Sequence, residues 1–308
     1  FAMIPPPDQA LCALVARSLS SMLNIDLHCH SNVSDGVLTP ADLVARAAAN
    51  GVHALALTDH DDLAGIAAAR AAADAVGMTL IPGVEISVSW GGQTVHIVGL
   101  RVDPAYPGLA VGLHGIRLGR IERAQRMAAD LAQSGIDGAY EGAYAFAANK
   151  QMLGRTHFAR WLVAQGHAPD MRTAFRRFLT RGNPGYVEHE WTSLENAVGW
   201  IRASGGMAVI AHPGRYDFKA RELHLLLDDF RSLGGEGIEV ITGSHHPSEY
   251  GKFADLARAF GLKASRGTDF HAPDEGVDIG RLPALPHYCQ PVWQGWPELS
   301  AQISPSTA

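Results

Sequence analysis

Residues 51–60 read GVHALALTDH: a glycine, a short apolar run and then polar residues that can bind a metal ion. Upstream, Thr39 and Pro40 predict the N-cap and first turn of a helix that runs to Asn50 and is capped by Gly51. The apolar run that follows predicts a buried β-strand over residues 54–58. Together these signals describe one helix–strand unit whose strand ends in metal-binding chemistry.

The same order of glycine, apolar run and polar end recurs along the chain. Its later copies are residues 77–85 (GMTLIPGVE), 206–212 (GMAVIAH), 237–245 (GIEVITGSH) and 261–269 (GLKASRGTD). Continuous apolar strands are typical of parallel sheets buried on both faces, and parallel barrels place their reactive residues at the carboxyl ends of the strands. We therefore expect a barrel-like α/β fold. The Gly91-Gly92 pair between residues 86–90 and 94–100 predicts one hairpin within it.

Composition limits the function classes. The chain has 308 residues and a net charge of −6, so it has an ample core and no global basic field for nucleic acid. The three cysteines, Cys12, Cys29 and Cys289, suggest neither a disulfide framework nor a thiolate zinc site, and we expect a reducing, cytoplasmic location. No P-loop, G-x-G-x-x-G or G-x-S-x-G motif occurs.

The predicted organisation has four parts. Residues 1–21 are expected to be an N-terminal extension, since they fit a signal peptide or membrane span poorly. The barrel is expected over residues 22–102 and 187–290, with a tail over residues 291–308. The strand pattern stops between residues 103 and 186, which predicts an inserted helical subdomain.

The predicted insertion is rich in basic residues. They are Arg117, Arg120, Arg123, Arg126, Lys150, Arg155, Arg160, Arg172, Arg176 and Arg177. In an otherwise acidic chain they could form a lid over an anionic substrate, or they could lie on solvated helix faces. The aromatic residues Trp161, Phe175 and Phe178 fall at helical spacings nearby, where we expect packing, with base stacking as the alternative.

Histidines and carboxylates at the predicted strand ends form a candidate metal site. His28 and His30 stand at i and i+2, on one face of the first strand. Glu85 is expected to end the third strand, where it either bridges two metals or forms a salt bridge. The nine candidate ligands are His28, His30, Asp35, His60, Glu85, His96, His212, Asp269 and His271. Nine donors exceed the needs of one ion and predict two or three divalent metals.

A multinuclear site favours phosphoryl chemistry. Two metals lower the pKa of a shared water from about 15.7 to near 7 and neutralise charge on phosphate oxygens. We expect the nucleophile to be a metal-bridging hydroxide near Glu85. Mn²⁺ is the expected cofactor, although such donor sets also accept Fe²⁺, Co²⁺ or Zn²⁺.

Seven motifs together resemble the PHP (polymerase and histidinol phosphatase) family of the amidohydrolase superfamily. They are DLHCHS, SDG, TDHD, PGVEIS, HIVGL, IAHPGR and GTDFH, within residues 24–100 and 187–288. The resemblance implies a distorted (β/α)7 TIM-like barrel that holds up to three metals. It implies one metal on His28, His30, Glu85 and Asp269, a second on Glu85, His96 and His212, and a third on Asp35, His60 and His271. Asp35 departs from the pattern, because many relatives have a histidine there.

The stretch NKQMLGRTHFARWLV resembles a subgroup of stand-alone PHP phosphoesterases. Members similar to it remove the 3'-phosphate from nucleoside 3',5'-bisphosphates, such as adenosine 3',5'-bisphosphate, and some trim RNA from its 5' end. The resemblance implies that phosphate is bound by Arg117, Lys150, Arg155 and His157, with His245 as a further candidate. His157 could equally cap the helix that begins there.

The expected substrate is therefore a small nucleotide or a short RNA, with no membrane or DNA duplex as a partner. Two alternatives remain at this point. One is another phosphoesterase of the same family, acting on histidinol phosphate or on an oligonucleotide end. The other is a metal-binding regulatory module without turnover. The sequence predicts no oligomeric state.

Overall fold

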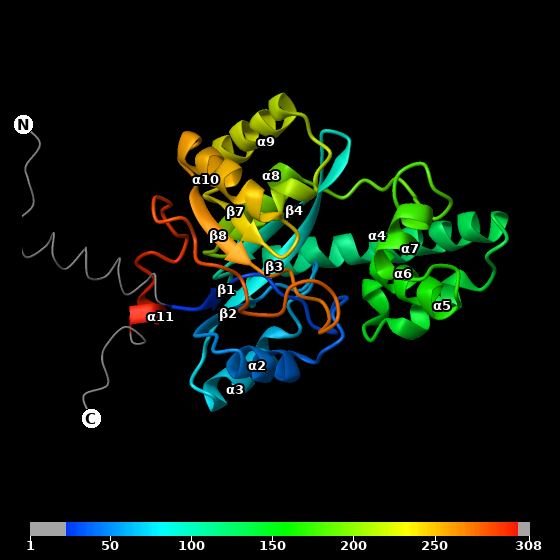
Figure 1. Ribbon diagram of the computed structural model, residues 1–308, viewed down its shortest axis with the longest axis horizontal. Helices are drawn as coiled ribbons and strands as arrows, with labels where there is room; N and C mark the ends of the chain where they lie inside the picture. The colour runs from blue at the N-terminus through cyan, green and yellow to red at the C-terminus, as the bar shows by residue number, and fades with distance from the viewer. Residues whose placement is uncertain (1–22, 301–308) are drawn as a thin grey trace, which may run out of the picture.

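The computed structural model describes residues 23–300 and contains a nearly closed barrel (Figure 1). Its strands are β1 (Ile25–Asp26), β2 (Ala54–Leu57), β3 (Thr79–Trp90), β4 (Gln93–Leu100), β6 (Met207–Ile210), β7 (Gly237–Thr242) and β8 (Lys263–Gly267), paired in that order. β4 runs antiparallel to both neighbours and the other pairs are parallel. The short β5 (Thr192–Ser193) pairs with β3. The predicted distorted barrel is thus confirmed. It departs from a regular parallel barrel at the antiparallel strand β4.

Helices cover the outside of the barrel. They are α2 (Pro40–Ala49), α3 (Ile66–Ala75), α8 (Leu194–Ala203), α9 (Ala220–Ser232) and α10 (Tyr250–Ala259), with the short α11 (Pro297–Ser300) near the end of the described chain. The predicted start of α2 is confirmed, since the Thr39 side chain accepts a hydrogen bond from the Asp42 amide. None of the helices within residues 23–300 combines the length and apolarity that a membrane span requires.

The β3–β4 hairpin differs in one way from the expectation. Gly91 and Gly92 have φ of +57° and +73°, which confirms the predicted tight turn. However, β3 is one continuous strand of twelve residues, so the expectation that Glu85 ends a strand is wrong. The strand continues because the stretch beyond Glu85 pairs with β4 along its whole length. Glu85 consequently lies in mid-strand.

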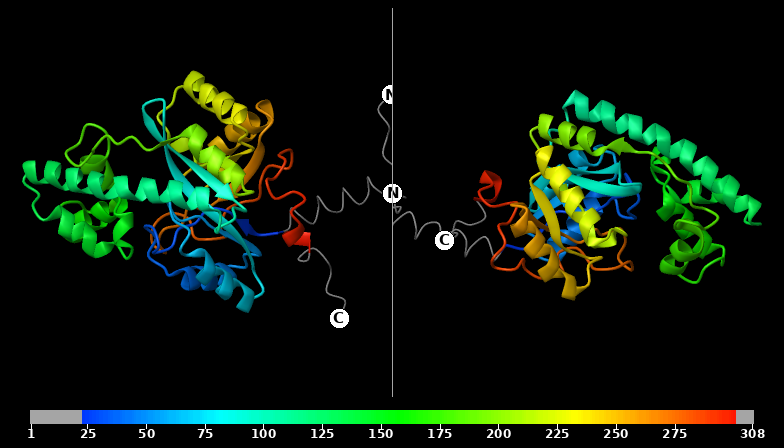
Figure 2. Two further views of the ribbon diagram at one scale, coloured as in Figure 1. Left: turned by 180° about the vertical axis from the view of Figure 1, so that it is seen from behind. Right: turned by 90° about the horizontal axis from the view of Figure 1, so that it is seen from above.

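A helical lobe stands beside the barrel. It contains α4 (Pro107–Gln133), α5 (Ala139–Phe146), α6 (Arg155–Ala164), α7 (Met171–Ala174) and a π-helical turn (Phe175–Leu179). α4 leads away from the barrel, and the shorter helices gather along its far half (Figure 2). They share an apolar cluster distinct from the barrel's clusters. Residues 103–186 are all described and hold helices but no strand. That they form a separate subdomain stays a prediction.

The Asp26 side chain contributes to closure of the barrel. Its carboxylate accepts hydrogen bonds from the amide of Thr268, the hydroxyl of Thr268 and the amide of Gly280, each at 2.9 Å. Next to it, the Leu27 amide donates to the Arg266 carbonyl at 3.1 Å. The first strand is thereby joined to the segment that follows the last.

Both ends of the chain extend beyond the described residues. The predicted extension, residues 1–21, is outside the described residues, as are residues 301–308 of the predicted tail. Within the described part of that tail, Trp293 and Trp296 are buried against barrel residues such as Val209.

Asp26→Ala should lower the free energy of unfolding by about 3 kcal/mol, because it removes the acceptor of two buried donors of Thr268 and of the half-buried Gly280 amide. Asp74→Ala, an exposed carboxylate on α3, is the control and should change it by less than about 0.5 kcal/mol. Urea unfolding measures both. Equal stability of the two variants would contradict the closing role of Asp26.

Candidate metal centre

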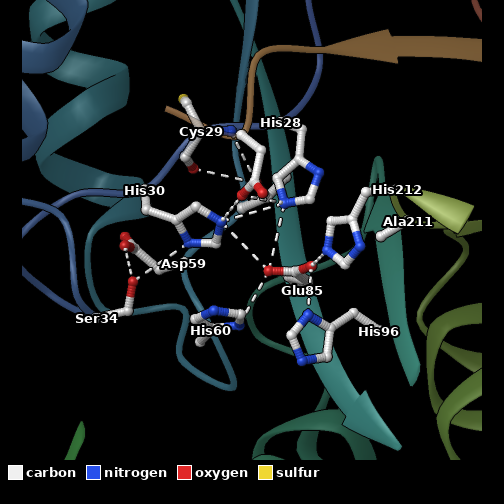
Figure 3. A network of polar contacts seen from close by, with 12 residues as sticks. His28, Cys29, His30, Ser34, Asp59, His60, Glu85, His96, Ala211 and His212 are labelled. Atoms are coloured by element: carbon white, nitrogen blue, oxygen red, sulfur yellow. Dashed lines mark hydrogen bonds and ion pairs between the residues drawn. The ribbon is translucent and has the colours of Figure 1, made fainter. Parts of the chain in front are cut away.

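The nine predicted ligands converge at one end of the barrel. Figure 3 shows His28, His30, His60, His96 and His212 around Glu85. The segments after β1, β2, β6 and β8 supply His28, His30, His60, His212, Asp269 and His271. β3 supplies Glu85, β4 supplies His96, and the loop before α2 supplies Asp35. The carboxyl ends of the parallel strands therefore bring together side chains that are up to 243 residues apart, from His28 to His271.

The Glu85 carboxylate is fully buried among five imidazoles. Its Oε1 lies 2.9 Å from Nδ1 of His96 and 2.9 Å from Nε2 of His212. Its Oε2 lies 2.9 Å from Nδ1 of His60, and also near His28 and His30. Burial alone would raise the pKa of Glu85, but the positive field of the imidazoles outweighs it and holds that pKa well below its usual value.

Three sets of donor atoms are close enough to hold a metal ion each. They are His28, His30, Glu85 and Asp269; His60, Glu85 and His96; and His30, Asp35, His60 and His271. The first set equals a predicted one. In the second, His60 stands where His212 was expected, although His212 Nε2 is 2.9 Å from Glu85. In the third, His30 joins the predicted residues.

The donor atoms fit divalent cations. Asp35 Oδ1, His60 Nδ1 and Glu85 Oε2 are buried, and none of their close contacts with one another or with other ligands has hydrogen-bond geometry. The Nε2 atoms of His28 and His30 face each other at 3.1 Å. Buried polar atoms that converge without hydrogen bonds are costly unless a cation lies between them. This part of the barrel therefore has the chemistry of a site for divalent metals, as the sequence predicted.

Outer contacts turn the imidazoles toward the centre. Nδ1 of His28 is 2.9 Å from Oε1 of Glu239, a buried carboxylate on β7, so Nε2 of His28 faces the ligand set. Nδ1 of His271 likewise lies 2.8 Å from the carbonyl of Asp269, and Nε2 faces Asp35 at 3.2 Å. Metal-ligating histidines are usually fixed in this way.

Glu239 also holds a second predicted ligand. Its Oε2 accepts a 2.6 Å hydrogen bond from the amide of His212, whose φ of +26° is unusual for a residue other than glycine. Asp269 shares this feature, with φ of +55°. Backbone strain of this kind gathers at functional sites, where the surrounding contacts maintain it.

An arginine pocket adjoins the ligand set. We use this name for the hollow that Asp35, His60, His96 and His271 share with Arg120, Arg123, Arg155, Arg215 and Trp191. It leads to an outer cavity of about 720 Å³ between α6, α7 and the loops after β7 and β8. Both hollows are lined by Thr156, Phe175, Arg215 and His271.

Two of the four guanidinium groups in the arginine pocket have carboxylate partners. Arg120 pairs with Asp61, and Arg215 is 2.7 Å from Asp269. Arg123 has no carboxylate partner within residues 23–300; it is 7% exposed, its Nε makes no hydrogen bond, and its guanidinium lies 5.2 Å from the Trp191 ring. Burial first, and then the charges of Arg155 and Arg120, lower its pKa well below the usual value. The pocket therefore carries positive charge that an anion would compensate.

Of the predicted phosphate-binding residues, only Arg155 lines this pocket. Arg117 donates to the Asp61 carbonyl, and Lys150 donates to the Tyr144 carbonyl. His157 caps α6, because its Nδ1 accepts from the Gly154 amide, and burial lowers its pKa to about 4. His245 accepts from the Gly214 amide. Arg117 Nε is also buried without a hydrogen-bond partner. The phosphate-binding roles of these four side chains stay predictions.

The sequence alone places Arg123 only among the basic residues of the predicted insertion, and it indicates no role for Arg215 or Glu239. The signal for Arg123 is its register, since Arg120 and Arg123 continue the buried series Leu109, Leu113, Ile116 on α4 and precede Met127 and Leu131. Arginines at core positions of an amphipathic helix are rare unless they serve a site. Glu239 likewise interrupts an apolar strand that is buried throughout.

Comparison with known proteins agrees with the geometry. A family model described as the PHP domain matches residues 26–151. A 3',5'-nucleoside bisphosphate phosphatase of Chromobacterium violaceum is 55% identical over 283 residues, which cover 92% of this chain and 98% of the relative. This chain belongs to the PHP domain family. A 5'-3' exoribonuclease of Escherichia coli is 43% identical and covers 88% of this chain and 93% of its own.

Solved structures of this PHP fold agree as well. An amidohydrolase structure from Chromobacterium violaceum, with bound sulfate and no metal, has 55% identity and a TM-score of 0.87, covering 91% of this chain and 96% of its own. A Bifidobacterium adolescentis protein assigned as a metal-dependent phosphoesterase has 27% identity and a TM-score of 0.73. The match covers 82% of this chain and 92% of that protein. The predicted PHP membership, and with it the class of metal-dependent phosphoesterases, is confirmed.

Glu239→Gln should weaken binding of divalent metal about 10- to 100-fold, because its NH2 group replaces one of the two oxygens that contact Nδ1 of His28 and the His212 amide. Competition with a fluorescent chelator measures the affinity. Glu236→Gln, at an exposed surface pair with Lys263, is the matched control. Unchanged metal affinity in a folded Glu239→Gln protein would contradict the positioning role.

Proposed function

We propose that this PHP protein hydrolyses the 3'-phosphate of nucleoside 3',5'-bisphosphates, for example adenosine 3',5'-bisphosphate to AMP and phosphate. The observation that carries the proposal is the arginine pocket, which places uncompensated positive charge directly beside the candidate metal ligands. A substrate with one phosphate at the metals and another at the guanidinium groups would satisfy both features. The activity named for the Chromobacterium relative, and the sulfate in the related structure, support this substrate class.

The proposal gives the arginines different tasks, on the basis of their charge partners. Arg215 is half exposed, pairs with Asp269 and lines both hollows, so it suits a phosphate held at the ligand set. Arg123 and Arg155 lie deeper among cations, and neither pairs with a carboxylate within residues 23–300. Guanidinium groups bind phosphate oxygens bidentately. These two arginines are therefore the proposed partners of the second phosphate.

Residues of this chain would hold the metal ions and fix the substrate. Divalent metals, when bound, supply Lewis acidity that activates water and neutralises charge on the phosphate. His28, His30, Glu85 and Asp269 would hold one ion, and His60 and His96 a second that shares Glu85, while His30, Asp35, His60 and His271 form the candidate third set. The guanidinium groups fix the substrate and offset the charge that develops as the 3'-oxygen leaves.

Mn²⁺ is the proposed ion. The three carboxylates, Asp35, Glu85 and Asp269, suit Mn²⁺, whereas the imidazoles leave Fe²⁺, Co²⁺ and Zn²⁺ able to compete. We also propose a cytoplasmic location, with which the free thiols of Cys29 and Cys289 accord.

A second activity, 5'-3' exonucleolytic trimming of short RNA, is favoured by one feature. The outer cavity gives the arginine pocket a wide continuation, in which a chain longer than one nucleotide could lie. Relatives from Escherichia coli and Haemophilus influenzae carry this activity in their names. Hydrolysis of histidinol phosphate is less well supported, since that substrate offers no second phosphate to the arginines.

Chelation should abolish phosphate release from adenosine 3',5'-bisphosphate, and added Mn²⁺ should restore it. Asp269→Asn and His28→Ala should remain inactive after Mn²⁺ is added, because each lacks a donor of the first ligand set. Colorimetric phosphate assays measure these outcomes. Full, chelator-resistant turnover in either variant would overturn the metal-dependent mechanism.

Arg123→Gln should lower kcat/KM for adenosine 3',5'-bisphosphate about 10- to 100-fold, through loss of a charged contact to the second phosphate. For adenosine 3'-monophosphate, which lacks that phosphate, the change should stay below about threefold. Arg126→Gln, three residues further along α4 and exposed, is the control. Equal losses on both substrates would show that Arg123 does not recognise the second phosphate.

A further inference from the structure

Few aromatic rings line the two connected hollows. Apart from the predicted histidine ligands, they are Trp191 in the arginine pocket and Phe175, which lines both the pocket and the outer cavity. The two rings differ in what surrounds them. That difference decides which ring is free to contact a ligand.

Trp191 is committed to the protein. It is 8% exposed, and the guanidinium groups of Arg120 and Arg123 lie 4.9 Å and 5.2 Å from its ring. His189 contacts this ring edge-on with centroids 4.2 Å apart, and Nε1 of Trp191 donates to the Thr94 hydroxyl. Its role is to support the arginines.

Phe175 has no such partners. Within residues 23–300, its ring has no stacked or edge-on aromatic neighbour and no cation over its face. Phe178, in the same helical turn, instead carries the Arg177 guanidinium 5.0 Å from its centroid and lines neither hollow. Phe175 is half-buried, so its ring is anchored in the lobe while part of it faces the hollows.

The local backbone and the cavity wall suit a ligand contact. Phe175 begins the π-helical turn Phe175–Leu179, and single π-helical turns occur frequently at functional sites. The outer cavity beside it is partly apolar, with Val163, Met171 and Val277 in its wall, and its volume is in the range of ligand pockets. A flat, apolar ligand group that extends from the phosphate sites would meet Phe175 first.

We propose that Phe175 is the stacking platform for the substrate's nucleobase, which occupies the outer cavity while the phosphates occupy the ligand set and the arginine pocket. This inference rests on the proposed nucleoside bisphosphate substrate. Stacking on one ring tolerates any base, since every base has a π face. Phe175 thus determines selection for a nucleotide over a plain sugar bisphosphate, without selecting among bases.

The test compares adenosine 3',5'-bisphosphate with base-free 1-deoxyribose 3,5-bisphosphate, using the Mn²⁺-loaded full chain. Phe175→Leu keeps apolar bulk in the lobe but removes the aromatic face, so it should raise KM for the nucleotide about 5- to 100-fold. Its effect on the base-free substrate should stay below about threefold. Phe175→Trp should retain the low KM for the nucleotide.

Phe178→Leu is the matched control, since it alters the same turn away from the hollows. It should leave both KM values unchanged, and thermal melting should show both leucine variants folded. Equal KM changes on the two substrates, or none in Phe175→Leu, would overturn the stacking role. If the wild-type protein hydrolysed neither substrate, the proposed function itself would fail, and the stacking inference with it.

Discussion

The structure depends on one buried negative charge. Glu85 is held in the middle of β3 with no solvent exposure and with five imidazoles around its two oxygens. Such a carboxylate is tolerated only where positive charge is guaranteed, either by protonated histidines or by metal ions. Because imidazoles that ligate a metal must be neutral, bound divalent ions would take over the compensation of this charge.

Contacts farther from Glu85 position the other ligands and the arginines around it. Asp26 closes the barrel, so that ligands from its first and last strands meet, and Glu239 orients the imidazole of His28 and the backbone of His212. Farther out, Arg120 anchors α4 to Asp61 and leaves Arg123 beside the site. The helical lobe is thereby fixed where its arginines and Phe175 complete a pocket on the open side of the ligand set.

Sequence reasoning succeeded where the signal is local and repeated. Glycine-ended helices, apolar strands and the polar residues after them predicted the barrel and the gathering of nine ligands, because parallel strands must end on one side. The tertiary contacts of a side chain cannot be read from such a pattern. The phosphate-binding roles of Lys150, His157 and His245 stay predictions, and in the structure each of these side chains bonds to nearby backbone. Arg123 was hidden among surface-like arginines, and only its register on α4 distinguished it.

The central claim is that Glu85 is shared between metal ions. Anomalous diffraction at the manganese edge, from crystals of the protein loaded with Mn²⁺, tests it most directly. We expect at least two peaks, one bonded to each oxygen of Glu85, with His96 beside one of them and Asp269 beside the other. A single peak, or peaks that do not contact Glu85, would contradict the shared carboxylate and the function built on it.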